Sequence, residues 1–250
     1  MKNGSIRILA VGNSFSDDAF QWLHDLAEAD GIDLTAVNLY IGGCNLETHW
    51  NNLCSGEKAY LYRKNGQSTD RYVSIQDALE EGSWDYIMTQ QASHDSGLEE
   101  TYFPYLEYIT SFLRQQCPEA TLLLHETWAY ELDSDHSAFL RYNCNQKEMF
   151  SRLRSCYHEA ACRLNLPLIP SGEVIQKVRG MKPFRYELGE RSLCRDGYHM
   201  DLVYGRYLVA GVIYVFLTGR NLCENPFVPP EGDPEVLKVL KKAVQSHFQA

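Results

Sequence analysis

Short apolar runs alternate along the chain with longer segments in which apolar residues recur at helical spacing. The apolar runs are each five to eight residues long, and they comprise residues 6–11, 33–40, 84–90, 120–126 and 166–170. Nearly continuous apolar runs of this length, bounded by turn residues, indicate strands that are buried on both faces of a sheet. We therefore predict five parallel strands.

The segments between these runs predict helices over residues 17–30, 101–117, 143–164, 200–218 and 229–248. In the first of them Phe20, Leu23, Leu26 and Ala27 fall on one face. Strands that alternate with helices, joined by right-handed crossovers, predict a three-layer α/β/α sandwich. An eight-stranded α/β barrel also fits the length, but five strands favour the open sheet.

Two segments interrupt this alternation. Residues 49–73 form an insertion whose tyrosine-rich pieces flank an Asn-Gly pair, which predicts a small hairpin. Residues 181–198 are irregular. We expect both segments to lie over the ends of the sheet as loops. Because no repeat or linker is apparent, residues 1–250 are interpreted as a single domain with an insertion at about 49–73.

Composition restricts the classes of partner. A chain of 250 residues suffices for one large core, and its 44% hydrophobic and 22% charged residues are ordinary for a soluble protein. The net charge of −10 argues against a nucleic-acid partner. The longest apolar stretch, residues 208–219, is shorter than the roughly 20 residues of a membrane span, so no membrane insertion is expected. The oligomeric state is left open.

The N-terminal apolar run and the cysteines bear on localisation. The run at residues 6–11 is too short for the core of a signal peptide. The eight cysteines are scattered without a CxxC pair, which indicates neither a zinc site nor a disulfide framework. We therefore expect a cytoplasmic protein with reduced thiols and no cofactor or metal, although a secreted protein without its leader would show the same pattern.

The turn GNSFSDDAF, residues 12–20, follows the first predicted strand directly. In an open parallel sheet, ligands bind where the carboxyl ends of strands meet the following helices. A helix that begins near Asp17 would direct its amide groups at Ser14, where they stabilise negative charge. We expect Ser16 to be the N-cap of that helix, with Asp17 and Asp18 as alternatives. The plain alternative is a polar turn without chemistry.

The segment RDGYHMD, residues 195–201, supplies what a serine nucleophile requires. A serine hydroxyl needs a base, and the base needs a partner that orients it. Asp196 and His199 are three residues apart, so the carboxylate can hold one imidazole nitrogen while the other faces a hydroxyl. A helix cap with a surface histidine is the alternative reading of this pair.

Together the two motifs resemble those of the SGNH (GDSL-type) hydrolases. GNSF is similar to their Gly-Asp-Ser-Leu block, and DGYH is similar to their Asp-x-x-His block. The C-terminal stretch from DGYH onward also resembles a bacterial subgroup catalogued as a domain of unknown function. The resemblance implies a flavodoxin-like sandwich with Ser14 as nucleophile, His199 as general base and Asp196 as its orienting partner.

The same resemblance implies an oxyanion hole built from the amide of Ser14, a glycine after the second strand and an asparagine after the third. Gly43 is our choice for the glycine, with a simple tight turn as the alternative. Where Gly-x-Asn-Asp is expected, residues 89–97 read TQQASHDSG. Gln91 could replace the asparagine as donor, with Gln90 or Ser93 as alternatives.

Asn13 takes the place of the usual aspartate in the first block, where its amide can tie down loop backbone. Three further residues are candidates for substrate binding: His94 after the third strand, Trp128 as an aromatic floor for a sugar ring, and Arg195 as a clamp. Local hydrogen bonding, packing and an ion pair with Asp196 are the respective structural alternatives.

His125, after the fourth strand, is a further candidate for substrate contact, with a local hydrogen bond as its alternative. Asp133, Asp135 and His136 superficially suggest a metal cluster, but they lack further spaced ligands, so a solvated loop is expected there.

These features favour a serine esterase that removes a small acyl group through an acyl-enzyme. An acetylated carbohydrate as the substrate rests on the resemblance alone. The alternatives are a non-catalytic glycan-binding protein and a nucleotide- or flavin-binding module, although the first turn lacks both GxGxxG and GK[ST] patterns. Substrate identity, acyl-chain length and the role of the insertion stay open.

Overall fold

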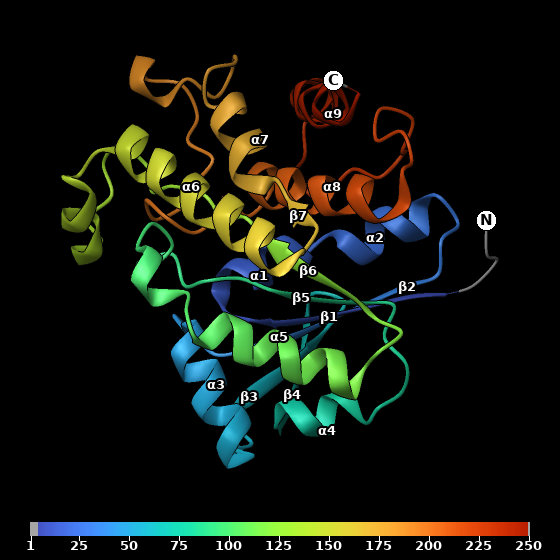
Figure 1. Ribbon diagram of the computed structural model, residues 1–250. Helices are drawn as coiled ribbons and strands as arrows, with labels where there is room; N and C mark the ends of the chain where they lie inside the picture. The colour runs from blue at the N-terminus through green and yellow to red at the C-terminus, as the bar shows by residue number, and fades with distance from the viewer. Residues whose placement is uncertain (1–4, 250) are drawn as a thin grey trace.

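The computed structural model describes residues 5–249, in which a seven-stranded sheet lies between helical layers (Figure 1). The strand order is β4-β3-β2-β1-β5-β6-β7. The strands are β1 (Ile6–Gly12), β2 (Leu34–Tyr40), β3 (Tyr60–Lys64), β4 (Gln67–Val73), β5 (Tyr86–Thr89), β6 (Thr121–His125) and β7 (Leu168–Ile169). Residues 1–4 and 250, which belong to the predicted domain over residues 1–250, lie outside the described residues.

The five predicted parallel strands are confirmed. β2, β1, β5, β6 and β7 pair in parallel, with Leu9 of the central β1 opposite Val37 on one side and Ile87 on the other. Residues 8–11 of β1 are fully buried, as a strand covered on both faces requires. Parallel strands bring their carboxyl ends to one edge, where the loops after β1, β2 and β5 meet.

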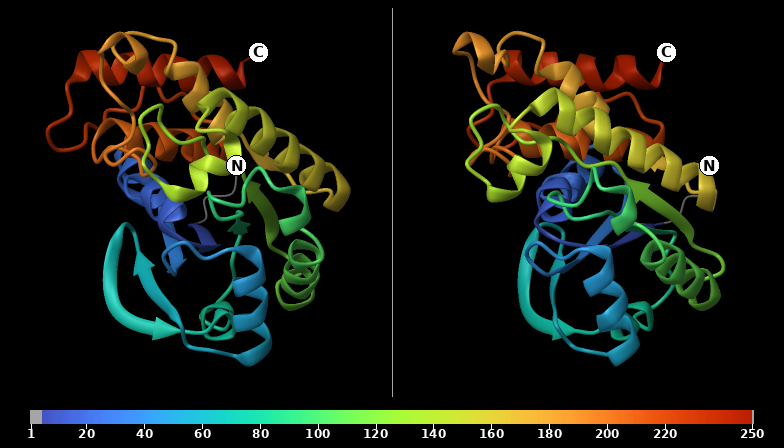
Figure 2. Two further views of the ribbon diagram at one scale, coloured as in Figure 1. Left: turned by 90° about the vertical axis from the view of Figure 1, so that its left-hand side faces the viewer. Right: turned by 60° about the vertical axis from the view of Figure 1, so that its left-hand side comes forward.

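The hairpin predicted around Asn-Gly is also confirmed, but its expected position over the end of the sheet is wrong. β3 pairs antiparallel with β2, and β4 with β3, so the hairpin extends the edge of the sheet by two strands (Figure 2). Tyr60 and Tyr62 alternate toward the buried side, and Asn65 exchanges two hydrogen bonds with the backbone of Ala36. The hairpin therefore pairs the backbone N–H and C=O groups on the side of β2 that β1 does not cover.

Helices cover both faces of the sheet. In Figure 1, α3, α4 and α5 lie on one face, and α1, α2, α8 and α9 lie on the other. The helices are α1 (Ser14–Phe20), α2 (Leu23–Ala29), α3 (Leu46–Ser55), α4 (Ile75–Leu79), α5 (Tyr105–Gln116), α6 (Gln146–Leu164), α7 (Ser171–Val178), α8 (Tyr204–Thr218) and α9 (Pro234–Phe248). Short 3-10 helices are η1 (Glu99–Thr101), η2 (Ser137–Tyr142) and η3 (Tyr186–Leu188).

The first predicted helix begins earlier than expected and is divided into α1 and α2. Asn13 is the N-cap of α1, since its Oδ1 accepts the Phe15 amide at 2.9 Å. Ser16 is the third helical residue and reaches back to accept the Asn13 amide at 2.9 Å. The assignment of Ser16 as N-cap is therefore wrong. Ser16 instead forms a capping box with the N-cap Asn13. This box requires glycine at position 12, because a Cβ there would lie 1.9 Å from Ser16 Oγ.

The long apolar stretch near the C-terminus is an internal helix. α8 is buried from Tyr207 to Val215 because it contacts α1, α2, α7 and α9. In residues 5–249 no helix is both long and apolar enough to cross a bilayer. α3, α4 and α7 are short helices that the sequence pattern did not predict.

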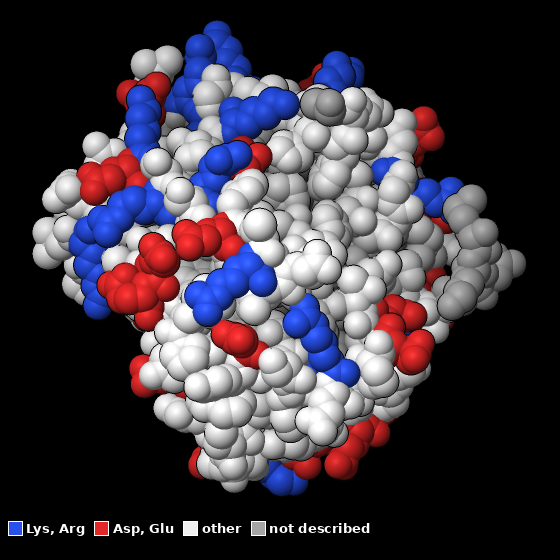
Figure 3. Space-filling model, viewed as in Figure 1, with Lys and Arg blue, Asp and Glu red and all other residues white. Residues whose placement is uncertain are grey.

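Charged side chains of both signs share the face shown in Figure 3. Ion pairs also join neighbouring helices, such as Arg154 of α6 with Glu173 of α7 at 2.7 Å and Arg163 of α6 with Glu107 of α5 at 3.5 Å. Acidic and basic groups are thus interspersed on this face.

The start of α8 fits tightly against the segment that precedes it. A Cβ on Gly205 would lie 2.4 Å from the backbone oxygen of Leu193. We expect Gly205→Ala to lower the free energy of unfolding by about 1–3 kcal/mol, because a backbone atom cannot rotate away. Urea denaturation measures this. Gly180→Ala, whose Cβ would meet its nearest neighbour at 3.4 Å, is the control. Equal stabilities of the two variants would contradict the packing described.

Candidate active site

Asn13 connects the three loops that meet at the carboxyl edge of the sheet. Its Oδ1 accepts hydrogen bonds from the Phe15 amide at 2.9 Å and from Gln90 Nε2 at 3.2 Å. Its Nδ2 donates to the Cys44 carbonyl at 3.0 Å. The side chain is buried, so these bonds are shielded from water. The prediction that the Asn13 amide ties down loop backbone is confirmed.

Ser14 stands at the centre of this edge as the first residue of α1. It is half-buried, and within residues 5–249 its Oγ makes no hydrogen bond. The first amide groups of a helix have no acceptor inside the helix, so the Ser14 N–H is also available to a ligand. The hydroxyl and the amide of one residue are thus both free at the positive end of α1.

Asp196 and His199 form the contact that their spacing predicted. Asp196 Oδ2 lies 2.7 Å from His199 Nδ1, and Oδ1 accepts the His199 amide at 2.8 Å. Burial opposes ionisation of Asp196, but the hydrogen bonds from the side chain and backbone of His199 prevail and lower its pKa. The carboxylate therefore stays charged and holds the imidazole by Nδ1, which leaves Nε2 as the outward nitrogen.

Segments that are far apart in the sequence meet beside this pair. The His199 ring lies 6.0 Å, centroid to centroid, from the ring of Phe15, the residue that follows Ser14. Phe15 in turn stacks on Trp128 at 4.2 Å. Trp128 Nε1 donates to the Tyr198 carbonyl at 2.8 Å, which fixes the backbone directly before His199. Packing thus brings the imidazole to the turn that carries Ser14.

A buried carboxylate holds the segment containing His199 against α1. The side chain of Asp18 is 1% exposed. Both of its carboxylate oxygens accept hydrogen bonds from Arg195 Nη1 at 3.0 Å, and Oδ1 also accepts one from Arg206 Nε at 2.8 Å. It also accepts the Met200 amide at 2.9 Å. Sequence reasoning missed this role of Asp18. The available signal was its position four residues after Ser14, on the same side of the helix.

Arg195 therefore does not act as the sequence suggested. It pairs with Asp18 rather than with Asp196, and its Nη1 also donates to the Met200 carbonyl. A guanidinium engaged in this way fixes the loop and is not free to clamp a substrate. The prediction of Arg195 as a substrate-binding residue is not supported by these contacts.

Gly43 lies in an exposed turn directly before Cys44, which Asn13 holds. The turn is closed by a bond from the Cys44 amide to the Ile41 carbonyl at 3.3 Å, and Gly43 has a left-handed φ of +64°. Within the described residues the Gly43 amide has no acceptor, so it is available to a ligand. Glycine suits this backbone conformation because a Cβ is strained there.

The bonds of Gln91 disagree with its predicted role. Its Nε2 donates to the carbonyl and Oγ1 of Thr101 at 2.9 and 3.0 Å, and its Oε1 accepts the amides of Leu46 and Ala92. The Nε2 protons of Gln91 thus bond to Thr101 rather than to a ligand, and the side chain is buried. Of the two alternatives, Gln90 bonds Asn13, and Ser93 Oγ lies 3.0 Å from Tyr130 OH.

Trp128 is fully buried and packs beneath Phe15, so the prediction that it forms a floor for a sugar ring is wrong.

His94 is half-exposed on the loop after β5, at 6.5 Å centroid distance from His136. His125 is buried and bonded to Ser171 at 2.9 Å, and burial lowers its pKa to about 3, so its imidazole is neutral and away from substrate.

The structure also adds His136, which the sequence assigned to a solvated loop. Its ring lies 4.9 Å from that of Tyr198, which lies 4.3 Å from His199. Burial, together with the neighbouring His94 and His199, lowers the pKa of His136. No local pattern could have revealed this position, because the contacts come from three separate loops.

Comparisons with known proteins agree with this architecture. The family model described as "Domain of unknown function (DUF4886)" matches residues 7–247. The crystal structure of a DUF4886 family protein from Bacteroides uniformis is 38% identical, has a TM-score of 0.92 and aligns with 98% of this chain and 95% of its own. No curated protein sequence matches the chain.

More distant structures share the fold. A Slackia heliotrinireducens protein provisionally described as an SGNH hydrolase is 21% identical with a TM-score of 0.57, over 86% of this chain and 100% of its own. An acetyl-xylooligosaccharide esterase from Geobacillus, in a mutant form, is 13% identical with a TM-score of 0.53, over 91% and 97% of the two chains. The chain thus has the fold of the SGNH hydrolases.

Removal of the Asp18 charge tests the loop anchor. We expect Asp18→Asn to lower the free energy of unfolding by about 3 kcal/mol or more, because two guanidinium groups lose their carboxylate in a buried setting. Denaturant unfolding measures this. The matched control is Glu235→Gln, which removes an exposed pair with Lys238 and should cost under about 0.5 kcal/mol. A similar small cost for both variants would show that Asp18 does not anchor the loop.

Proposed function

Since the chain belongs to the DUF4886 family and has the fold of the SGNH hydrolases, we propose that it is a serine hydrolase that cleaves small acyl esters. The observation that carries the proposal is the Asp196–His199 pair, which Asp18 and Trp128 hold beside the turn of Ser14. The free hydroxyl and amide of Ser14 at the start of α1 support it further.

In the proposed reaction, Ser14 Oγ attacks the ester carbonyl while His199 Nε2 takes the hydroxyl proton. The tetrahedral intermediate collapses, the C–O bond to the alcohol breaks, and His199 returns the proton to that leaving oxygen. A water molecule then attacks the acyl-enzyme by the same route, which releases the acid and restores Ser14. Asp196 stabilises the imidazolium that forms in each half of the reaction.

The amides of Ser14 and Gly43 are the proposed oxyanion donors, and the imidazole of His94 is the third. Gln91 is engaged with Thr101, whereas His94 is 28% exposed, with its Nε2 3.5 Å from Asp95 Oδ2. His94 holds the asparagine position when Ala92-Ser93-His94-Asp95 is aligned with Gly-x-Asn-Asp. An imidazole N–H is a competent donor for a developing oxyanion. This assignment replaces Gln91.

An acetylated carbohydrate is the substrate class we propose. One structural neighbour is described as an acetyl-xylooligosaccharide esterase. This chain has a series of half-exposed ring side chains that leads to His199, namely His94, His136 and Tyr198. Such rings can pack on the faces of a sugar and bond to its hydroxyls. The esterase test below also separates this proposal from a glycan-binding protein, which would bind sugar without hydrolysis.

Substitution of the triad tests the proposed chemistry. We expect a fluorophosphonate probe to label Ser14, and Ser14→Ala to abolish both labelling and hydrolysis of p-nitrophenyl acetate. Asp196→Asn should lower kcat on the order of 10³–10⁴-fold, because the imidazole loses its charged partner. Mass spectrometry and steady-state kinetics measure these effects. Full esterase activity in Ser14→Ala would refute the assignment.

Substitution of His94 tests the third donor. We expect His94→Ala to lower kcat on the order of 10²–10³-fold with little change in KM, because the bond forms chiefly in the transition state. His94→Asn should recover most of that loss, since its amide can donate from the same position. His24→Ala, on α2, is the control and should keep wild-type kinetics. A His94→Ala enzyme within threefold of wild type would exclude this donor.

A further inference from the structure

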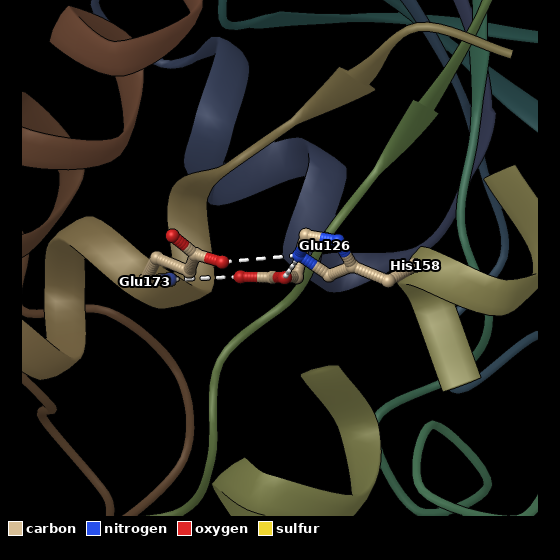
Figure 4. A group of neighbouring side chains, drawn as sticks. All are labelled: Glu126, His158 and Glu173. Carbon is tan, nitrogen blue, oxygen red and sulfur yellow. Dashed lines mark hydrogen bonds and ion pairs between the residues drawn. The ribbon is translucent and has the colours of Figure 1, made fainter. Parts of the chain in front are cut away.

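A second group of ionisable side chains lies outside the proposed active site. Glu126 follows β6 directly, His158 lies on α6 and Glu173 lies near the start of α7 (Figure 4). One ligand atom from each of the three falls within 4.8 Å of the other two. His158 Nε2 is 3.0 Å from Glu173 Oε1 and 3.7 Å from Glu126 Oε2.

Glu126 is held in this group by its surroundings. Its side chain is fully buried, and Oε1 accepts the Glu173 amide at 2.8 Å. A Cβ on Gly172 would lie 2.6 Å from that oxygen and 2.2 Å from the Thr127 carbonyl, so only glycine allows the carboxyl group this position. The second oxygen, Oε2, is buried, finds no hydrogen-bond partner among residues 5–249 and points toward His158 (Figure 4).

Burial, with the neighbouring Glu173, raises the pKa of Glu126 to about 8, and a buried carboxylate oxygen that lacks a partner is unfavourable unless a cation or donor satisfies it. One imidazole nitrogen and two carboxylate oxygens are ligands that Zn²⁺ accepts in proteins. Metal–ligand distances of about 2.0–2.1 Å in a tetrahedron place ligand atoms roughly 3.3 Å apart. The two distances measured from His158 Nε2, 3.0 and 3.7 Å, lie on either side of that value.

We propose that Glu126, His158 and Glu173 bind one divalent transition-metal ion of the Zn²⁺ type, which joins α6 and α7 to the end of β6. Water would complete the tetrahedron on the side where His158 is half-exposed. The cysteine spacing gave no indication of this site, because its three ligands come from separate elements and include no thiol. The proposal is independent of the ester chemistry at Ser14.

Two neighbours define the electrostatic surroundings of the site. Arg154 Nε lies 2.7 Å from Glu173 Oε1, the oxygen that also faces His158. Its side chain is 48% exposed, so a bound dication displaces it into solvent. His247 Nε2 lies 4.0 Å from Glu173 Oε2, and burial lowers the pKa of this imidazole. Metal binding therefore exchanges one exposed ion pair for a coordination sphere of which only Glu126 is fully buried.

The test is titration of the metal-stripped, untagged chain with ZnCl₂, followed by calorimetry and thermal unfolding. We expect one bound equivalent and a rise in Tm of roughly 5–10 °C at a free Zn²⁺ concentration 100 times the Kd. Glu126→Gln and His158→Gln should each weaken binding at least tenfold. The control His24→Gln, on α2, should leave the affinity unchanged. Circular dichroism verifies that each variant folds.

Co²⁺ in place of Zn²⁺ identifies the ligands, because thiolate coordination gives intense charge-transfer absorption that a nitrogen and oxygen ligand set lacks. A Co²⁺ spectrum without those bands is expected. The proposal is overturned if Zn²⁺ fails to bind at millimolar concentration, if Glu126→Gln and His158→Gln bind it as tightly as His24→Gln does, or if thiolate bands accompany the bound equivalent. Because none of these measurements uses esterase activity, their result stands apart from the test of Ser14.

Discussion

The buried carboxylate of Asp18 is the constraint on which the arrangement of loops at the carboxyl edge of the sheet depends. Within residues 5–249, the segment before α8 pairs with no strand of the sheet, and its one isolated bridge joins Cys194 to Met200 of the same segment. Asp18 supplies the attachment through Arg195, Arg206 and the Met200 amide. Charge-assisted bonds of this kind are strong when water is excluded. They set the position of His199 relative to α1, and therefore relative to Ser14.

Asn13 has the complementary role for the loops after β2 and β5. Its amide group both caps α1 and holds the loops after β2 and β5, so one planar side chain fixes the relative positions of three segments. The amide can do this because it carries acceptor and donor at once, whereas an ionised carboxylate only accepts. Asparagine at position 13, unlike an ionised aspartate, can therefore donate a hydrogen bond to the carbonyl of Cys44, which lies just before α3. Asp18 and Asn13 together place the loops that a tetrahedral intermediate would contact.

Buried aromatic packing also supports the carboxyl edge of the sheet, whereas the ring side chains on its exposed side include histidines and a tyrosine. Trp128 lies under Phe15 and bonds the Tyr198 carbonyl, which explains why an aromatic residue is buried at the end of β6 rather than exposed to substrate. His94, His136 and Tyr198 occupy the exposed side instead. The group around Glu126 links the segment that follows β6 to α6 and α7.

The sequence by itself determined the five parallel strands, the turn that presents Ser14 and the contact between Asp196 and His199. These features are local: a continuous apolar run is sufficient for a buried strand, and a spacing of three residues brings a carboxylate to an imidazole in one turn. Only the tertiary structure decided the partner of Arg195, the orientation of Gln91 and the burial of Trp128. Each depends on neighbours from remote segments, namely Asp18, Thr101 and Phe15. A polar or aromatic side chain at the edge of a sheet can turn toward substrate or toward the protein, and the choice depends on which donors, acceptors and rings the rest of the fold brings within reach.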